Sequence, residues 1–228
     1  MLLQALIKTA KDLNLWVRER KPFVAKAQAC LLILAGSSLA EVKQFLSWQG
    51  IKVSRQAISQ WVKGWQTVRD WVNTVPKKRR SIVAIDETKI KINGKQAFFW
   101  AAIDVKTREL IAIEISWQRN GAVAKWFIQD ILKRCKNKPK IITDGAGWYP
   151  WACRQLRICH EKVNGGLRNY IERFYRTFKD WAKNFYKNFI VRSKDLIIIV
   201  KERISLWCGM FYNWIREHQS LGCPPCLS

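Results

Sequence analysis

The chain has no hydrophobic stretch long enough to cross a membrane. Its apolar runs, such as Leu31–Ala35 and Leu196–Val200, are far shorter than the roughly 18 residues that a membrane span needs. The N-terminus also lacks the basic, apolar and small-residue pattern of a signal peptide. We therefore expect a cytoplasmic protein with no membrane partner.

Cysteine and histidine occur without the spacing of a disulfide framework, a zinc site or a catalytic triad. The seven cysteines are an odd and scattered set, which does not suit a framework of disulfides. Cys223 and Cys226 have CxxC spacing, but no second pair completes a zinc site. Neither His160 nor His218 has a neighbouring Ser or Cys pattern that suggests a catalytic base. We expect free thiols and no Ser-His-Asp chemistry.

Acidic residues are scarce relative to basic ones. The chain has 41 Lys and Arg against 17 Asp and Glu, a net charge of +24. Residues 1–80 carry 15 basic and 4 acidic residues, and the rest of the excess is spread over residues 81–228. The charge therefore does not come from a basic tail. A polyanion is the natural partner, and nucleic acid is favoured over an anionic membrane surface.

Residues 24–65 have the rhythm of a helix-turn-helix domain. Ser38 followed by Glu41 forms a capping box ahead of the second helix, and Gly50 ends that helix. Ser54 caps the third helix. The helices predicted here are Val24–Ala35, Leu39–Gln49 and Arg55–Trp65.

The third of these helices has one apolar and one polar face. Its polar side chains, and those just before it, are of the types that bind base edges and phosphates in a DNA major groove. The predicted DNA-binding residues are Lys52, Ser54, Arg55, Gln56, Ser59, Gln60 and Lys63. The alternative is a small three-helix packing module with a solvated polar face. With the charge of the chain, the pattern favours double-stranded DNA as the partner.

A basic linker at residues 76–80 separates two predicted domains. Pro76 interrupts regular structure, and the four cations that follow repel one another unless an anion is near. A solvated charge run and a phosphate contact both fit this segment. We place a helical DNA-binding domain at residues 1–75 and a second domain at residues 81–228.

The second domain begins with three antiparallel strands and continues with alternating helices and strands. Asn93-Gly94 is a strong hairpin-turn signal between the first two strands. The predicted strands are Ser81–Ile92, Lys95–Asp104, Glu109–Trp117, Lys140–Thr143 and Arg157–Val163. The predicted helices are Gly121–Cys135, Trp148–Leu156, Tyr170–Phe189 and Asp195–His218. This order predicts an α/β fold, a mixed sheet flanked by helices, whose sites gather at strand ends.

Three carboxylates are candidates for a site on this sheet. Asp86 follows three apolar residues within a strand, where a buried acid is costly unless it is hydrogen-bonded or bound to a metal. Asp144 ends a strand, and Glu172 opens a helix. Hard oxygen ligands suit Mg²⁺ or Mn²⁺ better than zinc. Two such ions ~4 Å apart can activate a water or a 3′-hydroxyl for attack on a phosphodiester.

Each acid also has a purely structural interpretation. Asp86 could satisfy backbone groups at a strand irregularity, and Asp144 could make a turn before its glycines. Glu172 could complete a capping box with Asn169 or pair with Arg176. Taken singly these signals are modest, but their joint occurrence behind a helix-turn-helix favours a metal site.

Three segments resemble the signatures of DDE transposases: AIDET around Asp86, IITDGAGWY around Asp144 and NYIERFYRTFK around Glu172. The resemblance is closest to the compact insertion-sequence transposases of bacteria and archaea that move by forming cointegrates. Residues Tyr212–Pro225, YNWIREHQSLGCPP, also resemble the end of such transposases and of retroviral-type integrases. The resemblance spans roughly residues 24–225.

This resemblance implies an RNase H-like, integrase-like catalytic core. It implies that Asp86, Asp144 and Glu172 are catalytic and bind Mg²⁺ or Mn²⁺, as two ions, and that Arg176 and Lys179 contact DNA near the cleaved phosphate. The implied function is a transposase that binds terminal inverted repeats, cleaves 3′ ends and joins them to target DNA. A homodimer or higher oligomer, associated with the nucleoid, is expected because two element ends must be held together. An inactive transposase-derived DNA-binding protein and an RNase H-like nuclease are the alternatives.

The chain departs from the family in one spacing. The second and third acids lie 28 positions apart, which is shorter than in most relatives. Glu161 lies between them, but only Glu172 is followed by Arg and Lys at helical spacing. A short connection leaves an impaired copy open, and a tight Gly165-Gly166 turn that brings Glu172 to the site is equally consistent.

Overall fold

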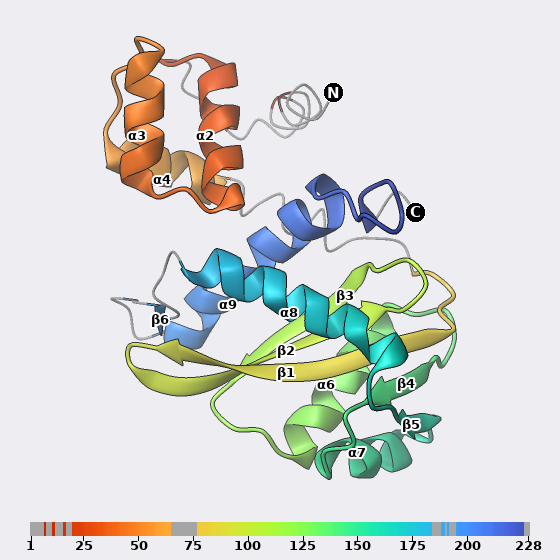
Figure 1. Cartoon of the computed structure of the whole chain (residues 1–228). Helices are drawn as coiled ribbons and strands as arrows, with labels where there is room; N and C mark the ends of the chain where they lie inside the picture. The colour runs from red at the N-terminus through yellow and green to blue at the C-terminus, as the bar shows by residue number, and fades with distance from the viewer. Residues whose placement is uncertain are drawn as a thin grey trace.

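A computed structural model describes residues 7, 11, 16, 20–64, 77–183, 188–189, 191 and 195–225 (Figure 1). In this part of the chain, a group of three helices precedes a mixed sheet that carries helices on both faces. No helix in these ranges is long and apolar enough to cross a membrane.

The three N-terminal helices begin and end close to where the sequence predicts. Both predicted caps are confirmed. Ser38 Oγ accepts a hydrogen bond from Glu41 N at 3.2 Å while Glu41 Oε2 accepts from Ser38 N at 2.6 Å, and Ser54 Oγ accepts from Ala57 N at 3.1 Å. The helices are α2 (Phe23–Ala35), α3 (Leu39–Trp48) and α4 (Arg55–Gly64). The predicted end of the third helix at Trp65 lies outside the described residues.

These helices have two apolar contacts, one internal and one with the C-terminal part of the chain. Val42, Leu46 and Ile58 are fully buried where α3 and α4 pack on α2. The other side of α2, at Leu34, lies in a separate cluster with Leu206. The helical group is therefore packed against the C-terminal part of the chain.

Strand β1 lies at the centre of the sheet. It pairs with an antiparallel strand on one side and with a parallel strand on the other. The strand order is β3-β2-β1-β4-β5, and a short strand β6 also pairs with β1. Asn93 and Gly94 both have positive φ, 49° and 78°, as the two central residues of a type I′ hairpin turn require. The strands are β1 (Ile82–Ile92), β2 (Lys95–Asp104), β3 (Leu110–Ser116), β4 (Lys140–Thr143), β5 (His160–Lys162) and β6 (Asn188–Phe189).

Two layers of helices cover the sheet, as Figure 1 shows. They are α6 (Gly121–Lys133) and α7 (Trp148–Leu156) on one face, and α8 (Asn169–Ala182) and α9 (Leu196–Leu206) on the other. Successive side chains of β1 point to opposite faces of the sheet. Val83 therefore lies in one core cluster with Phe127 on the first face, and Ala84 lies in another with Phe174 on the second. The predicted α/β fold with a mixed sheet is confirmed.

The prediction of one helix over Tyr170–Phe189 is wrong at its end. Helix α8 ends at Ala182, and Asn188–Phe189 forms β6. The fully buried Phe189 lies beside Ile92 at the end of β1. The Asn93 side chain donates to Val191 O at 2.8 Å and accepts from Val191 N at 2.9 Å. This long-range pairing favours extended backbone where the local periodicity favoured helix.

The prediction of one α-helix over Asp195–His218 is also wrong in its second half. Helix α9 ends at Leu206, and residues Trp207–Ile215 form a π-helical segment, η3. Arg216 N donates to Phe211 O at 2.8 Å, which is the i→i−5 bond of that geometry. Asn213 on η3 reaches Leu110, accepting from its N at 2.9 Å and donating to its O at 3.0 Å.

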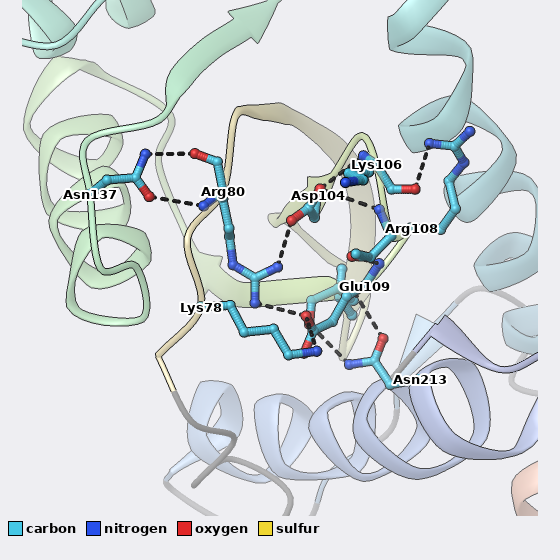
Figure 2. A network of polar contacts seen from close by, with 10 residues as sticks. Lys78, Arg80, Asp104, Lys106, Arg108, Glu109, Asn137 and Asn213 are labelled. Atoms are coloured by element: carbon cyan, nitrogen blue, oxygen red, sulfur yellow. Dashed lines mark hydrogen bonds and ion pairs between the residues drawn. The ribbon is translucent and has the colours of Figure 1, made fainter. Parts of the chain in front are cut away.

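Part of the basic run before β1 is buried in ion pairs within the protein (Figure 2). Arg80 is 4% exposed, and its guanidinium donates to Asp104 Oδ2 and to Glu109 Oε2, each at 2.8 Å. Lys78 Nζ lies 3.4 Å from Glu109 Oε2. Neither alternative for this run, a solvated charge cluster or a phosphate contact, applies to Arg80, because its anions are supplied by the turn between β2 and β3.

Candidate active site

Two of the three predicted acids belong to neighbouring parts of the sheet: Asp86 lies on β1, and Asp144 directly follows β4. Strand β1 pairs in parallel with β4, with Ala84 opposite Ile142. Continuing this register by two residues sets Asp86 level with Asp144. The charge of Asp144 contributes to raising the pKa of Asp86, which places the two carboxylates within electrostatic reach.

Asp86 is buried and hydrogen-bonded. It is 9% exposed, and its Oδ1 accepts from Glu87 N at 2.9 Å while its Oδ2 accepts from Arg168 Nη2 at 3.0 Å. Burial raises the pKa of Asp86, and the bond from Arg168 acts in the opposite direction. The cost of placing an acid in this strand is thus real, and Arg168 offsets part of it.

Asp144 makes a local turn as well as facing the site. Its Oδ1 accepts from Ala146 N at 3.0 Å, the bond of an Asx-turn. Gly145, which follows, has a φ of +85°, a backbone conformation that favours glycine. A Cβ at that position would also meet the Lys162 side chain, which would have to move aside. The turn interpretation and a role in the site are therefore compatible.

Glu172 lies in the first turn of α8 and is linked to Asp86 through an arginine. Its side chain is 49% exposed, and Arg168 Nη1 lies 3.3 Å from its Oε1. The capping-box alternative is wrong, because Asn169 is the first residue of the helix and no side-chain bond caps it. Arg168 thus contacts Asp86 with one nitrogen and Glu172 with another.

The carboxylates suit a hard cation in chemistry, but the described structure does not gather them into a cluster. Among the described residues, no group of three or more His, Cys, Asp and Glu is arranged to hold a metal ion. Asp86 and Asp144 are adjacent, whereas Arg168 lies between Asp86 and Glu172. A positive charge is therefore already accommodated at this position, and the donor oxygens are of the type that Mg²⁺ and Mn²⁺ prefer.

A fourth carboxylate, Glu87, lies next to Asp86 and was missed by the sequence reasoning. Its side chain is 4% exposed, accepts a hydrogen bond from the Tyr149 hydroxyl, and lies 3.4 Å from Arg119 Nη1. Burial raises the pKa of Glu87, and the charges of Asp86 and Asp144 add to the effect. Its position directly after Asp86 was the only signal in the sequence.

Tyr175 connects the helix that carries Glu172 to the strand that carries Asp86. Its buried hydroxyl lies 2.6 Å from Asp86 O and 3.0 Å from Phe99 O. Its ring lies in the hydrophobic core between α8 and the sheet. The hydroxyl of a buried tyrosine needs a partner, and that need was the unused signal.

The predicted DNA-binding residues are solvent-accessible. Arg176 and Lys179 are exposed on α8, the helix that carries Glu172. Glu161, the alternative third acid, lies on β5 and pairs with Lys140. Of the seven residues predicted to bind DNA in the helical group, Ser59 is partly buried. The other six are exposed: Lys52, Ser54, Arg55, Gln56, Gln60 and Lys63.

Comparison with known proteins gives a family match and several relatives. Residues 80–194 match the family described as the DDE domain. The chain is 38% identical over 204 residues to the uncharacterized protein MJ0017 of Methanocaldococcus jannaschii, covering 90% of this chain and 92% of that protein. It is 31% identical over 111 residues to the transposase for insertion sequence element IS257 in transposon Tn4003 of Staphylococcus aureus. That match covers 48% of this chain and about half, 49%, of the transposase.

A solved structure shares the fold. A chain in the cryo-electron microscopy structure of the simian T-cell lymphotropic virus intasome, in complex with the PP2A regulatory subunit B56 gamma, superposes with a TM-score of 0.50. The two are 12% identical, and the match covers 87% of this chain and 72% of that chain. At this identity the similarity concerns the fold alone. It agrees with the RNase H-like mixed sheet predicted from the sequence.

Proposed function

The chain belongs to the DDE family of insertion-sequence transposases, and from that premise we propose that it cleaves the 3′ ends of its element and joins them to target DNA. The observation that carries the proposal is the pairing of β1 with β4, which sets Asp86 beside Asp144. Glu172 is joined to Asp86 through Arg168, so the three acids belong to one polar centre.

In this proposal Asp86, Asp144 and Glu172 hold Mg²⁺ or Mn²⁺, as two ions. When bound, these ions activate a water or a 3′-hydroxyl and stabilise the leaving oxygen of the phosphodiester. The chain's own contribution is to hold the carboxylates. The backbone N–H of Glu87 and the hydroxyl of Tyr175 fix the strand at Asp86, and the Asx-turn fixes Asp144.

The exposed cations of α8 would position the DNA strand at this centre. Arg176 and Lys179 follow Glu172 at i+4 and i+7 and are exposed. Residues four and seven apart share one helix face, so both can reach phosphates that lie next to the glutamate. Their side chains neutralise the backbone of the DNA strand while the carboxylates act on one phosphodiester.

The helical group is proposed to recognise the terminal inverted repeats. We assign DNA binding to residues 1–75, a linker to 76–80 and catalysis to 81–228. The polar face of α4 and the turn before it support this, because their long polar and basic side chains are exposed. A homodimer or higher oligomer would hold the two element ends, and the +24 charge suits a protein associated with the nucleoid.

Strand transfer of a labelled terminal-repeat oligonucleotide tests this function. We expect Asp86→Asn, Asp144→Asn and Glu172→Gln each to lower the rate at least ~100-fold, which is about 3 kcal/mol of barrier, while DNA binding is kept. Glu161→Gln is the matched control, since it neutralises an acid on β5 and should leave the rate within about twofold of the unchanged protein. Full activity in any of the first three variants would remove that residue from the site.

A catalytically inactive DNA-binding protein is the second candidate. Two observations favour it. The acids do not form a metal cluster among the described residues, and Asp144 and Glu172 lie only 28 positions apart. Calorimetry with Mn²⁺ separates the two, because the inactive protein would show no uptake that depends on Asp86 and Asp144. An RNase H-like nuclease would take up metal but release hydrolysed rather than joined products.

A further inference from the structure

The guanidinium of Arg168 occupies the position between two of the three proposed metal ligands. Its Nη2 lies 3.0 Å from Asp86 Oδ2 and its Nη1 lies 3.3 Å from Glu172 Oε1. A divalent ion held by this pair needs lone pairs of the same carboxylates. We propose that Arg168 is a built-in counter-cation that competes with the divalent metal for Asp86 and Glu172, an inference that rests on the proposed function.

The surroundings explain why a cation is needed here when no metal is bound. Asp86, Glu87 and Asp144 lie close enough for their charges to act on one another, and burial already disfavours the charge on Asp86. The Arg168 side chain is 18% exposed and that of Asp86 is 12% exposed. A buried carboxylate without a partner costs far more than an exposed one, so Arg168 stabilises the metal-free fold.

The contact with Glu172 is the weaker half of this arrangement. The Glu172 side chain is 49% exposed, and exposed ion pairs contribute little. Arg168 Nε is buried and has no hydrogen-bond partner among the described residues. An unsatisfied buried donor is unfavourable, so the bound position of Arg168 is not the best that a guanidinium can find. The balance between Arg168 and a metal ion is therefore closer than a fully satisfied ion pair would allow.

Arg168 lies at the junction between a short turn and α8. Arg168 ends the short turn η1 (Gly166–Arg168), and Gly165 and Gly166 have φ values of 80° and 57°. A Cβ at either glycine would meet nothing within 4 Å, and Leu167 is 42% exposed. Arg168 is also the residue that precedes α8, so its guanidinium can leave by rotation of its long side chain while Glu172 stays on the helix. The glycines before it leave the adjoining backbone free to adjust.

Arg168 could compete with the metal for the carboxylates or orient Glu172 to bind it. These two roles predict opposite effects of removing the guanidinium. If Arg168 competes with the metal, Arg168→Gln frees both carboxylates and tightens metal binding. If Arg168 instead orients Glu172 for the metal, the same change weakens binding. We expect the dissociation constant for Mn²⁺ to fall on the order of tenfold, a usual size for coupling between two ligands of one site.

The test is calorimetric titration of the full chain with Mn²⁺, for the unchanged protein, Arg168→Gln and Arg173→Gln. Arg173 is exposed on the same helix, so its variant loses the same charge without touching Asp86. We expect less than about a twofold change in Arg173→Gln. Thermal melting in a chelator should show a lower Tm for Arg168→Gln, and saturating Mn²⁺ should raise the Tm of that variant more than that of the unchanged protein.

Each result bears on the proposal. Tighter binding in Arg168→Gln alone, or uptake confined to that variant, supports the competition. Equal changes in both variants point to general electrostatics, and weaker binding in Arg168→Gln points to support of Glu172; either overturns it. If the unchanged protein and Arg168→Gln bind Mn²⁺ with the same affinity, only the role of Arg168 fails. If neither of these two proteins takes up Mn²⁺, the metal site of the proposed function fails and this inference fails with it.

Discussion

A single hydroxyl group connects the elements that carry two of the proposed catalytic carboxylates, Asp86 and Glu172. Tyr175 Oη lies within hydrogen-bonding distance of two backbone carbonyls, Asp86 O and Phe99 O, on adjacent strands. Its one proton can serve only one of them at a time, so the two carbonyls share it. Because Tyr175 lies one turn after Glu172, this contact sets the position of α8 against β1 at the site.

We expect Tyr175→Phe to lower both stability and strand transfer. The change leaves two buried carbonyls without this donor, which should cost about 1–2 kcal/mol of unfolding free energy. For a chain of this size that is a fall in Tm of about 2–8 °C. Strand transfer should fall several-fold, because Asp86 and Glu172 lose a shared anchor. Thermal melting and strand-transfer kinetics measure the two effects.

Tyr170→Phe is the control for this experiment. Tyr170 lies in the first turn of the same helix, and its ring contacts the Arg108 guanidinium at 3.3 Å from the ring centroid. Removing its hydroxyl leaves the ring contact in place, so both measurements should change little. A Tyr175→Phe variant that behaves like this control would show that the hydroxyl does not position the site.

At this scale the sequence identified residues by type better than by partner. Asp86 was recognised because an acid within an apolar strand needs a reason, and the structure supplies hydrogen bonds to it. Arg168 was missed, although it precedes Glu172 by four positions, the spacing of helical ion pairs. Its contact with Asp86 joins residues 82 positions apart, which no local pattern reveals.

At the scale of elements, Arg80 joins segments that do not contact one another through regular structure. Its side chain pairs with Asp104 and Glu109 at the turn between β2 and β3 (Figure 2). Its backbone exchanges two hydrogen bonds with Asn137, ahead of β4, at 2.8 and 2.7 Å. The start of β1 is thereby held from two sides, which fixes where the strand carrying Asp86 begins.

We expect Arg80→Met to destabilise the protein strongly. The change removes the cation that the buried Asp104 and Glu109 share, while Lys78 Nζ remains 3.4 Å from Glu109 Oε2. Breaking a buried ion pair by removing one partner costs about 3–5 kcal/mol, or about 6–20 °C in Tm for a chain of this size. Thermal melting measures the loss.

A triple variant separates the loss of pairing from the loss of packing. Arg80→Met combined with Asp104→Asn and Glu109→Gln removes the unpaired charges while keeping side chains of similar size. We expect it to recover at least half of the lost Tm. Equal destabilisation of the single and triple variants would show that the packing of Arg80, rather than its charge, holds the start of β1.

The elements that sequence could predict are those determined by local signals. The hairpin at Asn93-Gly94 and the capping box at Ser38 need only neighbouring residues, and both are confirmed. Strand β6 depends on the bonds of Asn93 with Val191, 98 positions away, so the amphipathic pattern before it continued as a predicted helix. The same limit applies to the relative positions of Asp86, Asp144 and Glu172, which only the sheet register and the contacts of Arg168 can show.

At the scale of the whole molecule, part of the acidic charge lies inside the protein. Asp86, Asp104, Glu109 and Glu114 are buried, and they account for part of the 17 acidic residues. The last of these pairs with Lys201. Lys26 and Arg80 are buried as well, so burial removes cations from the surface too. The exposed cations are the groups that a polyanion meets.

We expect the salt dependence of DNA binding to report the cations of the helical group. Each phosphate contact contributes close to one unit to the slope of log K against log salt concentration. Changing Lys52, Arg55 and Lys63 together to Gln should therefore make the slope less steep by about 2–3, for specific and non-specific DNA alike. Titration of fluorescent duplexes over a range of salt concentrations measures it.

The two glutamines of the same helix should behave differently, because an uncharged side chain releases no counterions. Gln56→Ala with Gln60→Ala should leave the slope unchanged and reduce the preference for the terminal repeat, by about 1–3 kcal/mol for each glutamine that makes a bidentate pair with a base. Lys43→Gln is the matched control for the triple variant, since Lys43 is exposed on α3 and lies outside the proposed DNA-binding face. If the slope changes as much for this one cation as it does per cation in the triple variant, DNA binds through the overall charge and α4 is not the recognition helix.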